Sequence, residues 1–168
     1  EAAPAWQPAV PAISPDQVEA TLARARQALA SGWVEQGNSP GPGALELFLA
    51  VLAVEPANAA AIQGLAETLA ALQARVPALV RAGKLDEAAR IRNLVASTQP
   101  GHADAAATAK IYADGRAAAG LVLQAGEAAD KGRIVTPAGT SALDLYGRAL
   151  ERVPGFVPAL DGLQRWHR

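Results

Sequence analysis

The side chains that could do chemistry are few in this chain, and their spacing does not suit a catalytic or metal site. Cysteine is absent, so no thiolate can serve as a nucleophile or metal ligand, and the histidines are His102 and His167. His102 and Asp104 could offer two metal ligands. Two such neighbours at the start of a helix more often act as a cap and a partner of the helix dipole, so we expect no metal and no cofactor.

Other catalytic patterns are equally weak. Gly41-Pro42-Gly43 lacks the Lys-Ser or Lys-Thr pair and the strand–turn–helix context of a phosphate-binding loop. The adjacent carboxylates Asp86 and Glu87 stand at the head of an expected helix, where acidic side chains favour the dipole. We expect no serine nucleophile either, and therefore a protein that is not an enzyme.

Composition and charge argue against two classes of partner. The formal net charge of −1 gives no footprint for nucleic acid or an anionic membrane. No apolar run approaches the ~18 residues of a membrane span, so we expect no insertion into a bilayer. Hydrophobic residues make up 51% of the chain, and much of that share is alanine, which points to closely packed helices.

The chain is organised around a repeated stretch. Residues 44–65, ALELFLAVLAVEPANAAAIQGL, return as residues 142–163, ALDLYGRALERVPGFVPALDGL. Aromatic Phe48 is matched by Tyr146, and a fainter third copy lies between the two. The identical pairs are Ala44/Ala142, Leu45/Leu143, Leu47/Leu145, Leu52/Leu150, Pro56/Pro154, Ala61/Ala159, Gly64/Gly162 and Leu65/Leu163.

Each copy predicts two helices joined by a proline turn. Pro56 lacks the amide proton and blocks helix continuation, so one helix ends before it and Asn58 can cap the next. Ala44 and Val51 fall on one face of the first helix, where their small size lets a neighbouring helix come close. On the second helix, Gly64 yields space for the same packing.

The frame resembles the tetratricopeptide repeat (TPR), whose second helix carries Ala-x3-Phe and ends at Pro. The resemblance covers residues 15–168 and implies an all-α fold of about three TPR-like helix–turn–helix units with a C-terminal capping helix. The helices must be elongated, because the copies start 44 and then 54 residues apart instead of about 34. The matching residues are Ala44, Phe48 and Pro56, then Ala88 and Pro100 with Arg92 in the aromatic place, then Ala142, Tyr146 and Pro154.

The rest of the chain predicts further helices, a linker and two loops. Residues 1–14, with three prolines, predict an extended linker before a single domain at 15–168. The glycine-rich loops 32–43 and 132–140 replace tight turns and are alternative places for function. Their apolar residues Trp33, Val34, Ile134 and Val135 are expected to close each hairpin. The expected helices span 15–31, 43–55, 58–82, 85–98, 102–131, 140–152 and 156–167, with a bend or break before Pro77.

The resemblance also implies a function, because the first helices of TPR units line a groove that binds peptides or partner domains. We expect a non-catalytic scaffold for a protein or peptide partner. Four acids face one arginine among the groove residues, so a basic or apolar segment is expected there rather than an acidic one. The candidate groove residues are Gln63, Glu67, Asp104, Ile111, Asp114, Asp161 and Arg165.

Two other functions stay open: a structural or oligomerisation spacer, and an accessory or sensory region of an enzyme or receptor-like kinase whose catalytic domain lies elsewhere. Residues 132–146 resemble helical-repeat segments of bacterial envelope proteins, including TonB-type energy transducers and proteins with sulfatase-modifying-factor-like domains. This second resemblance implies a bacterial, periplasmic domain behind a membrane anchor, with the proline-rich start as its tether. A cytoplasmic location is the alternative.

Overall fold

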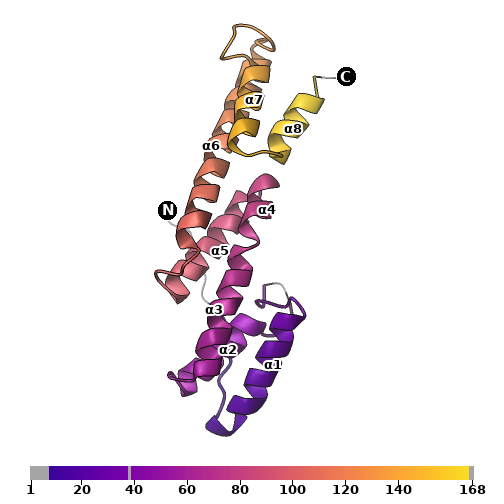
Figure 1. Cartoon of the computed structure of the whole chain (residues 1–168). Coiled ribbons are helices and arrows are strands. Elements are labelled where there is room, and N and C mark those ends of the chain that lie inside the picture. Colours follow the sequence, from indigo (N-terminus) through magenta and orange to yellow (C-terminus); the bar gives the residue numbers. More distant parts are fainter. Residues whose placement is uncertain (1–7, 38, 167–168) are drawn as a thin grey trace. The chain divides into compact units, whose positions relative to one another are not determined.

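The computed structural model describes residues 8–37 and 39–166, and every regular element in these ranges is a helix (Figure 1). The expected all-α fold is confirmed. Residues 1–7 of the expected linker, and His167 at the end of the last expected helix, lie outside the described residues. The elements are η1 (Pro15–Gln17), α1 (Val18–Ala30), α2 (Ala44–Val54), α3 (Ala59–Gln73), α4 (Val76–Arg81), α5 (Leu85–Thr98), α6 (Ala105–Asp130), α7 (Ala142–Arg152) and α8 (Val157–Gln164).

The predicted helix at 58–82 is divided into two. The first part, α3, ends at Gln73, and α4 begins at Val76 with Pro77 in its first turn. The break therefore falls where the missing amide of proline predicted it. None of the described helices is both long and apolar enough to cross a membrane.

The described residues pack as two compact units. The first unit contains the chain up to Ala74 together with Asn93–His102, and the second contains Arg75–Arg92 and the chain from Ala103 onward. Each unit contains one copy of the repeated stretch, because α2 and α3 belong to the first unit and α7 and α8 to the second. Each unit is described by itself below.

The core of the first unit is formed by the apolar faces of α1, α2 and α3. Ala44 and Val51 are fully buried, as their spacing predicted, and Phe48 is buried with them. Ile13, near the end of the expected linker, packs against the same core. The buried members of this cluster are Val18, Ala25, Ala28, Ala44, Leu47, Phe48, Val51 and Ala61.

In the second unit, α6 packs against α4, α7 and α8. Gly115 of α6 is buried, and a Cβ at this position would overlap the side chain of Val80 on α4. Ala142 and Ala149 of α7 are fully buried, like their counterparts in the first unit. Small residues thus set the close approach of helices in both units.

An aromatic ring lies against a glycine in each copy of the repeated stretch. A Cβ on Gly64 of α3 would overlap the ring of Phe48 on α2, and a Cβ on Gly162 of α8 would overlap the ring of Tyr146 on α7. Both rings are buried. The space that the sequence predicted Gly64 to yield is therefore occupied by the aromatic side chain of the preceding helix.

The middle copy replaces this contact with a different one. Arg92 stands in the aromatic place, and its guanidinium carbon lies 4.9 Å from the centre of the Tyr112 ring on α6. Thr108, buried, holds the position that glycine has in the other copies. A cation–π contact one helical turn further along thus substitutes for the aromatic–glycine contact.

We predict that Gly64→Ala and Gly162→Ala each lower the free energy of unfolding by about 1–3 kcal/mol, because the added methyl group overpacks a filled contact. Gly147→Ala is the matched control, since a Cβ there meets nothing within 4 Å. Removing a helical glycine at this open position is expected to stabilise by up to about 1 kcal/mol. Urea unfolding of the three variants measures the difference. Equal stabilisation by all three would show that the rings do not fill the glycine positions.

Candidate partner-binding surfaces

Two of the predicted groove residues, Gln63 and Glu67, line a hollow in the first unit. Its volume is about 500 Å³, and its walls come from α1 and α3, with Phe48 of α2 between them. This size lies within the range of pockets that hold small ligands or single side chains. The lining residues are Arg26, Leu29, Ala30, Phe48, Ala60, Gln63, Gly64 and Glu67.

The start of α3 fixes which of its side chains face this hollow. Asn58 caps the helix, because its Oδ1 accepts a hydrogen bond from the Ala61 N–H at 2.9 Å. Ala61 and Gly64 are buried, whereas Gln63 and Glu67 are exposed. Gln63 Nε2 donates a hydrogen bond to Glu67 Oε1 at 3.0 Å, so the amide and the carboxylate form one polar group at the edge of the hollow.

Asp161 and Arg165 occupy the positions in the second unit that Gln63 and Glu67 hold in the first, since the copies are offset by 98 residues. Both are exposed, Asp161 on α8 and Arg165 directly after it. Four of the seven predicted residues are therefore two pairs at equivalent positions. The charge is not repeated, because the acid at 67 is matched by an arginine at 165.

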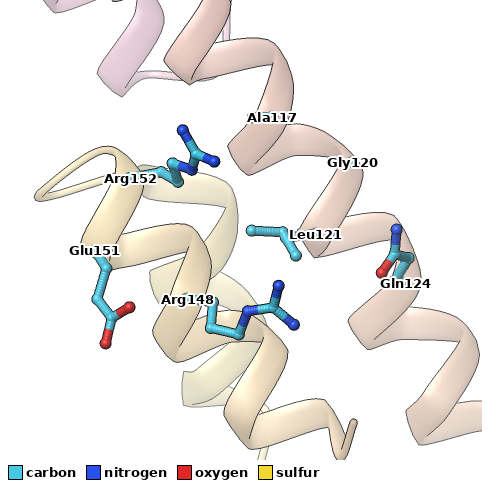
Figure 2. Close-up of a pocket in the computed structure, with 7 residues that line it drawn as sticks. All are labelled: Ala117, Gly120, Leu121, Gln124, Arg148, Glu151 and Arg152. Carbon is cyan, nitrogen blue, oxygen red and sulfur yellow. The ribbon is translucent and has the colours of Figure 1, made fainter. Parts of the chain in front are cut away.

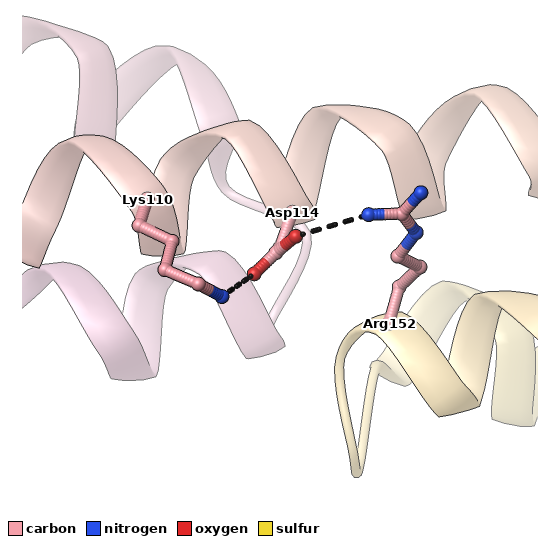
Figure 3. Close-up of polar contacts among 3 residues, drawn as sticks. All are labelled: Lys110, Asp114 and Arg152. Carbon is pink, nitrogen blue, oxygen red and sulfur yellow. Dashed lines mark hydrogen bonds and ion pairs between the residues drawn. The ribbon is translucent and has the colours of Figure 1, made fainter.

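Asp114 is held between two cations within the second unit (Figure 3). Lys110 Nζ lies 2.9 Å from its Oδ2, and Arg152 Nη1 of α7 lies 3.4 Å from its Oδ1. The hydrogen bond from Lys110, followed by the contact with Arg152, lowers the pKa of the Asp114 carboxyl below its usual value. Asp114 is thus already charge-matched, which the sequence did not indicate, because Arg152 reaches it through the fold.

Of the remaining predicted residues, Ile111 lies on α6 and Asp104 directly before it. Ile111 is half-buried, and Asp104 is exposed. The backbone carbonyl of Asp104 accepts hydrogen bonds from the amide and the hydroxyl of Thr108, both at 3.1 Å. These main-chain contacts join residue 104 to the first turn of α6.

The two glycine-rich loops close in the same way. Gly32 and Gly132 follow α1 and α6 with φ of 81° and 72°, a backbone conformation that suits glycine. Two main-chain hydrogen bonds then join each loop to the helix after it. These are Ala44 N to Trp33 O (3.0 Å), Leu45 N to Val34 O (2.8 Å), Ala142 N to Arg133 O (2.8 Å) and Leu143 N to Ile134 O (3.1 Å).

This pairing corrects the expectation that four apolar residues pin the loops. Val34 and Ile134 are the equivalent residues, and Val34 is 4% exposed as expected of a pin. Val135 is 64% exposed and Trp33 is 38% exposed, so the expectation is wrong for these two residues. Trp33 instead borders a hollow of about 360 Å³ beside the first loop, together with Arg24 and Pro42.

An acid in the first turn of the following helix fastens each loop. Glu46, fully buried, accepts hydrogen bonds from the backbone amides of Gln36 and Gly43, both at 3.0 Å. In the second unit, Asp144 accepts from the Gly139 amide at 2.6 Å and the Ser141 hydroxyl at 2.7 Å. Both acids therefore have a structural role, because each accepts hydrogen bonds from groups of the loop that precedes its helix.

Gly37 and Gly41 flank Ser39 in the spacing of a nucleophile elbow, G-x-S-x-G, which the expectation of no serine nucleophile did not take into account. In a working elbow the serine sits on a sharp turn from a strand to a helix. Here the segment lies in the loop between α1 and α2, and Ser39 N donates to Gln36 O at 2.8 Å. The motif therefore lacks the backbone setting that makes its serine reactive.

The candidate metal ligands are also engaged locally. His102 Nδ1 lies 2.7 Å from Gln73 Nε2, within the first unit. Among the described residues no three histidine, aspartate or glutamate side chains form a group that could hold a metal ion. His167 falls outside those residues.

A further hollow, which the sequence did not predict, lies between α6 and α7 in the second unit (Figure 2). Its volume is about 470 Å³, and two arginines of α7 border it. The lining residues are Ala117, Gly120, Leu121, Gln124, Arg148, Glu151 and Arg152. The positions of Arg148 and Arg152 in the sequence do not predict this hollow, because its other wall comes from α6.

No protein-family model, curated protein or solved structure matches the chain.

The lowered pKa of Asp144 predicts a pH-dependent contribution to stability. The hydrogen bond from the Ser141 hydroxyl, and then that from the Gly139 amide, hold this pKa below its usual value. The contribution is therefore complete above the unfolded-state pKa of about 3.9 and is lost as the pH falls through the lower folded-state value. Asp144→Asn should be less stable than the wild type at pH 7, and the difference should shrink at acid pH. Thermal melts from neutral to acid pH measure it, and a difference that stays constant would contradict the assignment.

Proposed function

We propose that the chain is a TPR-like helical-repeat domain that acts as a non-catalytic scaffold for a protein or peptide partner. The observation that carries this proposal is the recurrence of one packing unit, an alanine-faced helix, a proline turn and a glycine-bearing helix, in both halves of the described chain. Helical units that repeat in this way stack along one direction and present extended surfaces for binding.

The hollow between α1 and α3 is the part of this surface where we place the partner. Its apolar lining comes from Leu29, Ala30, Phe48 and Ala60, and its polar lining from Arg26 and the Gln63–Glu67 pair. An apolar lining of this kind takes an apolar side chain, while the polar groups fix its orientation through hydrogen bonds. We propose as ligand a short segment with an apolar anchor and a basic residue that reaches the carboxylate of Glu67.

The ion pairs of Asp114 reduce the number of acids that can attract a basic partner segment. Lys110 and Arg152 already match this acid, so it adds little attraction for a basic segment. Glu67 is the acid that borders the hollow, and its carboxylate accepts a hydrogen bond from the uncharged amide of Gln63. The attraction for a basic segment is therefore expected at Glu67, in the first unit.

A periplasmic location in a bacterium belongs to the same proposal and is supported by the resemblance of residues 132–146 to envelope proteins and by the proline-rich sequence at 1–14. Cell fractionation of the full-length product distinguishes it from the cytoplasmic alternative.

Site-specific photo-crosslinking in the cells that produce the protein tests the proposed function. A photoreactive residue replaces Gln63 in the hollow, and the control carries it at Ala53, an exposed position on α2. We expect a discrete cross-linked partner from Gln63 that is absent from Ala53. Adding Glu67→Lys should strongly reduce that product, because the new charge repels a basic segment. The same products from both positions, or no product from Gln63, would contradict the proposal.

A further inference from the structure

The hollow between α6 and α7 contains a helical glycine that no packing explains. A Cβ added at Gly120 would meet nothing within 4 Å, in contrast to Gly115 five residues earlier, where it would overlap Val80. Glycine inside a helix is unfavourable relative to alanine, and it is used where another group must approach the backbone closely. The space beside Gly120 is open and belongs to the hollow.

The first unit supplies an internal comparison. Gly132 and Gly32 end α6 and α1 with the same hydrogen bonds, so residues of α6 correspond to residues of α1 that are numbered 100 lower. On α7 the offset from α2 is 98. The counterparts of Gly120, Arg148 and Arg152 are Ala20, Ala50 and Val54.

This comparison shows that the position of Arg148 has a different environment in the two units. Ala50 is 1% exposed in the first unit, whereas Arg148 at the equivalent position is exposed to solvent in the second. The position that is buried packing in the first unit is therefore solvent-facing surface in the second, where it carries a charged side chain. In the second unit Gly120 and Arg148 line the same hollow.

The side chains around Gly120 suit an anion with planar oxygens. Figure 2 shows Arg148 extending from α7 toward α6, where Gln124 lies, while the carboxylate of Glu151 points away from α6. Arg152 also borders the hollow, but Asp114 lies 3.4 Å from its Nη1 and already matches its charge, so Arg152 adds little attraction for an anion. Guanidinium groups bind carboxylates through two parallel hydrogen bonds, and the amide of Gln124 adds a further donor.

We propose that this hollow binds aspartate or glutamate side chains of an acidic segment in a partner protein, with Arg148 as the main ligand, Gln124 as a supporting donor, and Gly120 leaving room for the carboxylate. The site lies within the second unit and is independent of the hollow over Phe48 in which the proposed function places its ligand. The ligand proposed for this hollow is acidic, whereas the ligand proposed for the hollow between α1 and α3 is basic.

The test uses the full chain and a fluorescein-labelled hexaglutamate peptide, with fluorescence anisotropy at low ionic strength as the measurement. Arg148→Ala, which restores the residue found at the equivalent position 50, should weaken binding about tenfold, the loss expected for one charge-assisted hydrogen-bonded contact. Arg81→Ala removes the same charge from an exposed position in the last turn of α4 and should leave binding within about twofold. Arg148→Lys keeps the charge but loses the fork, and should weaken binding as well.

Gly120→Ala separates binding from stability. The added methyl group fills the open space, so peptide binding should weaken while the melting temperature rises, because alanine favours the helix. Gly126→Ala is the matched control, a second α6 glycine with nothing within 4 Å of an added Cβ that does not line the hollow. This control should raise the melting temperature and leave binding unchanged.

Several outcomes would overturn the inference. Equal binding of the peptide by the wild type and Arg148→Ala would show that acidic peptides bind outside this hollow. No binding by the wild type would show that the chain does not bind acidic peptides. Equal losses for Arg148→Ala and Arg81→Ala would reduce the effect to general charge. Inorganic phosphate that binds Arg148 more tightly than the peptide would reassign the site to phosphate groups. None of these outcomes bears on cross-linking from Gln63, so the two proposals fail separately.

Discussion

The contact between an aromatic ring and a helical glycine sets the distance at which two helices pack after a proline turn. Phe48 against Gly64 and Tyr146 against Gly162 place the ring where a side chain would otherwise separate the helices. Ala44 and Val51 lie on the same side of α2 as Phe48, at helical spacing, and are fully buried in the same cluster. The hollow between α1 and α3 depends on this packing, because Phe48 and Gly64 are among the residues that line it.

Much of the fold could be predicted because proline and glycine act locally. Pro56 and Pro77 end or interrupt helices through the missing amide, and their neighbourhoods folded as expected. The spacing of Ala44 and Val51 identified a buried face, since small residues at helical period are informative whatever their partner. Helix ends were less predictable, as with α6, which begins at Ala105 three residues later than expected, because capping depends on hydrogen bonds several residues away.

The surfaces were harder to predict, since they depend on residues that meet only in the fold. Gln63 and Glu67, which the TPR-like frame placed on one helix face, line the same hollow because they lie one turn apart on one helix. Arg152 reaches Asp114 across 38 residues of chain, and nothing in the local sequence marks that pair. The hollow at Gly120 was missed for the same reason: its glycine was visible as a helix-weakening residue, but the arginines that give it chemistry belong to another helix.

The internal repeat makes the chain its own control. Where both copies keep a residue, as with the buried alanines and the acids that fasten the loops, packing or hydrogen bonding accounts for it. Where one copy departs, as at exposed Arg148 in place of buried Ala50, the same position faces solvent in one unit and the interior in the other. Departures of this kind identify the surfaces that are free to carry a function.

The aromatic–glycine contact is the packing on which both units depend, and nuclear Overhauser spectroscopy in solution measures it without altering the protein. Cross-peaks are expected between the ring protons of Phe48 and the α-protons of Gly64, and between those of Tyr146 and Gly162. Ring currents should also shift these glycine α-protons away from their usual helical values. Glycine α-protons with ordinary shifts and no cross-peaks to either ring would contradict the packing on which both units rest.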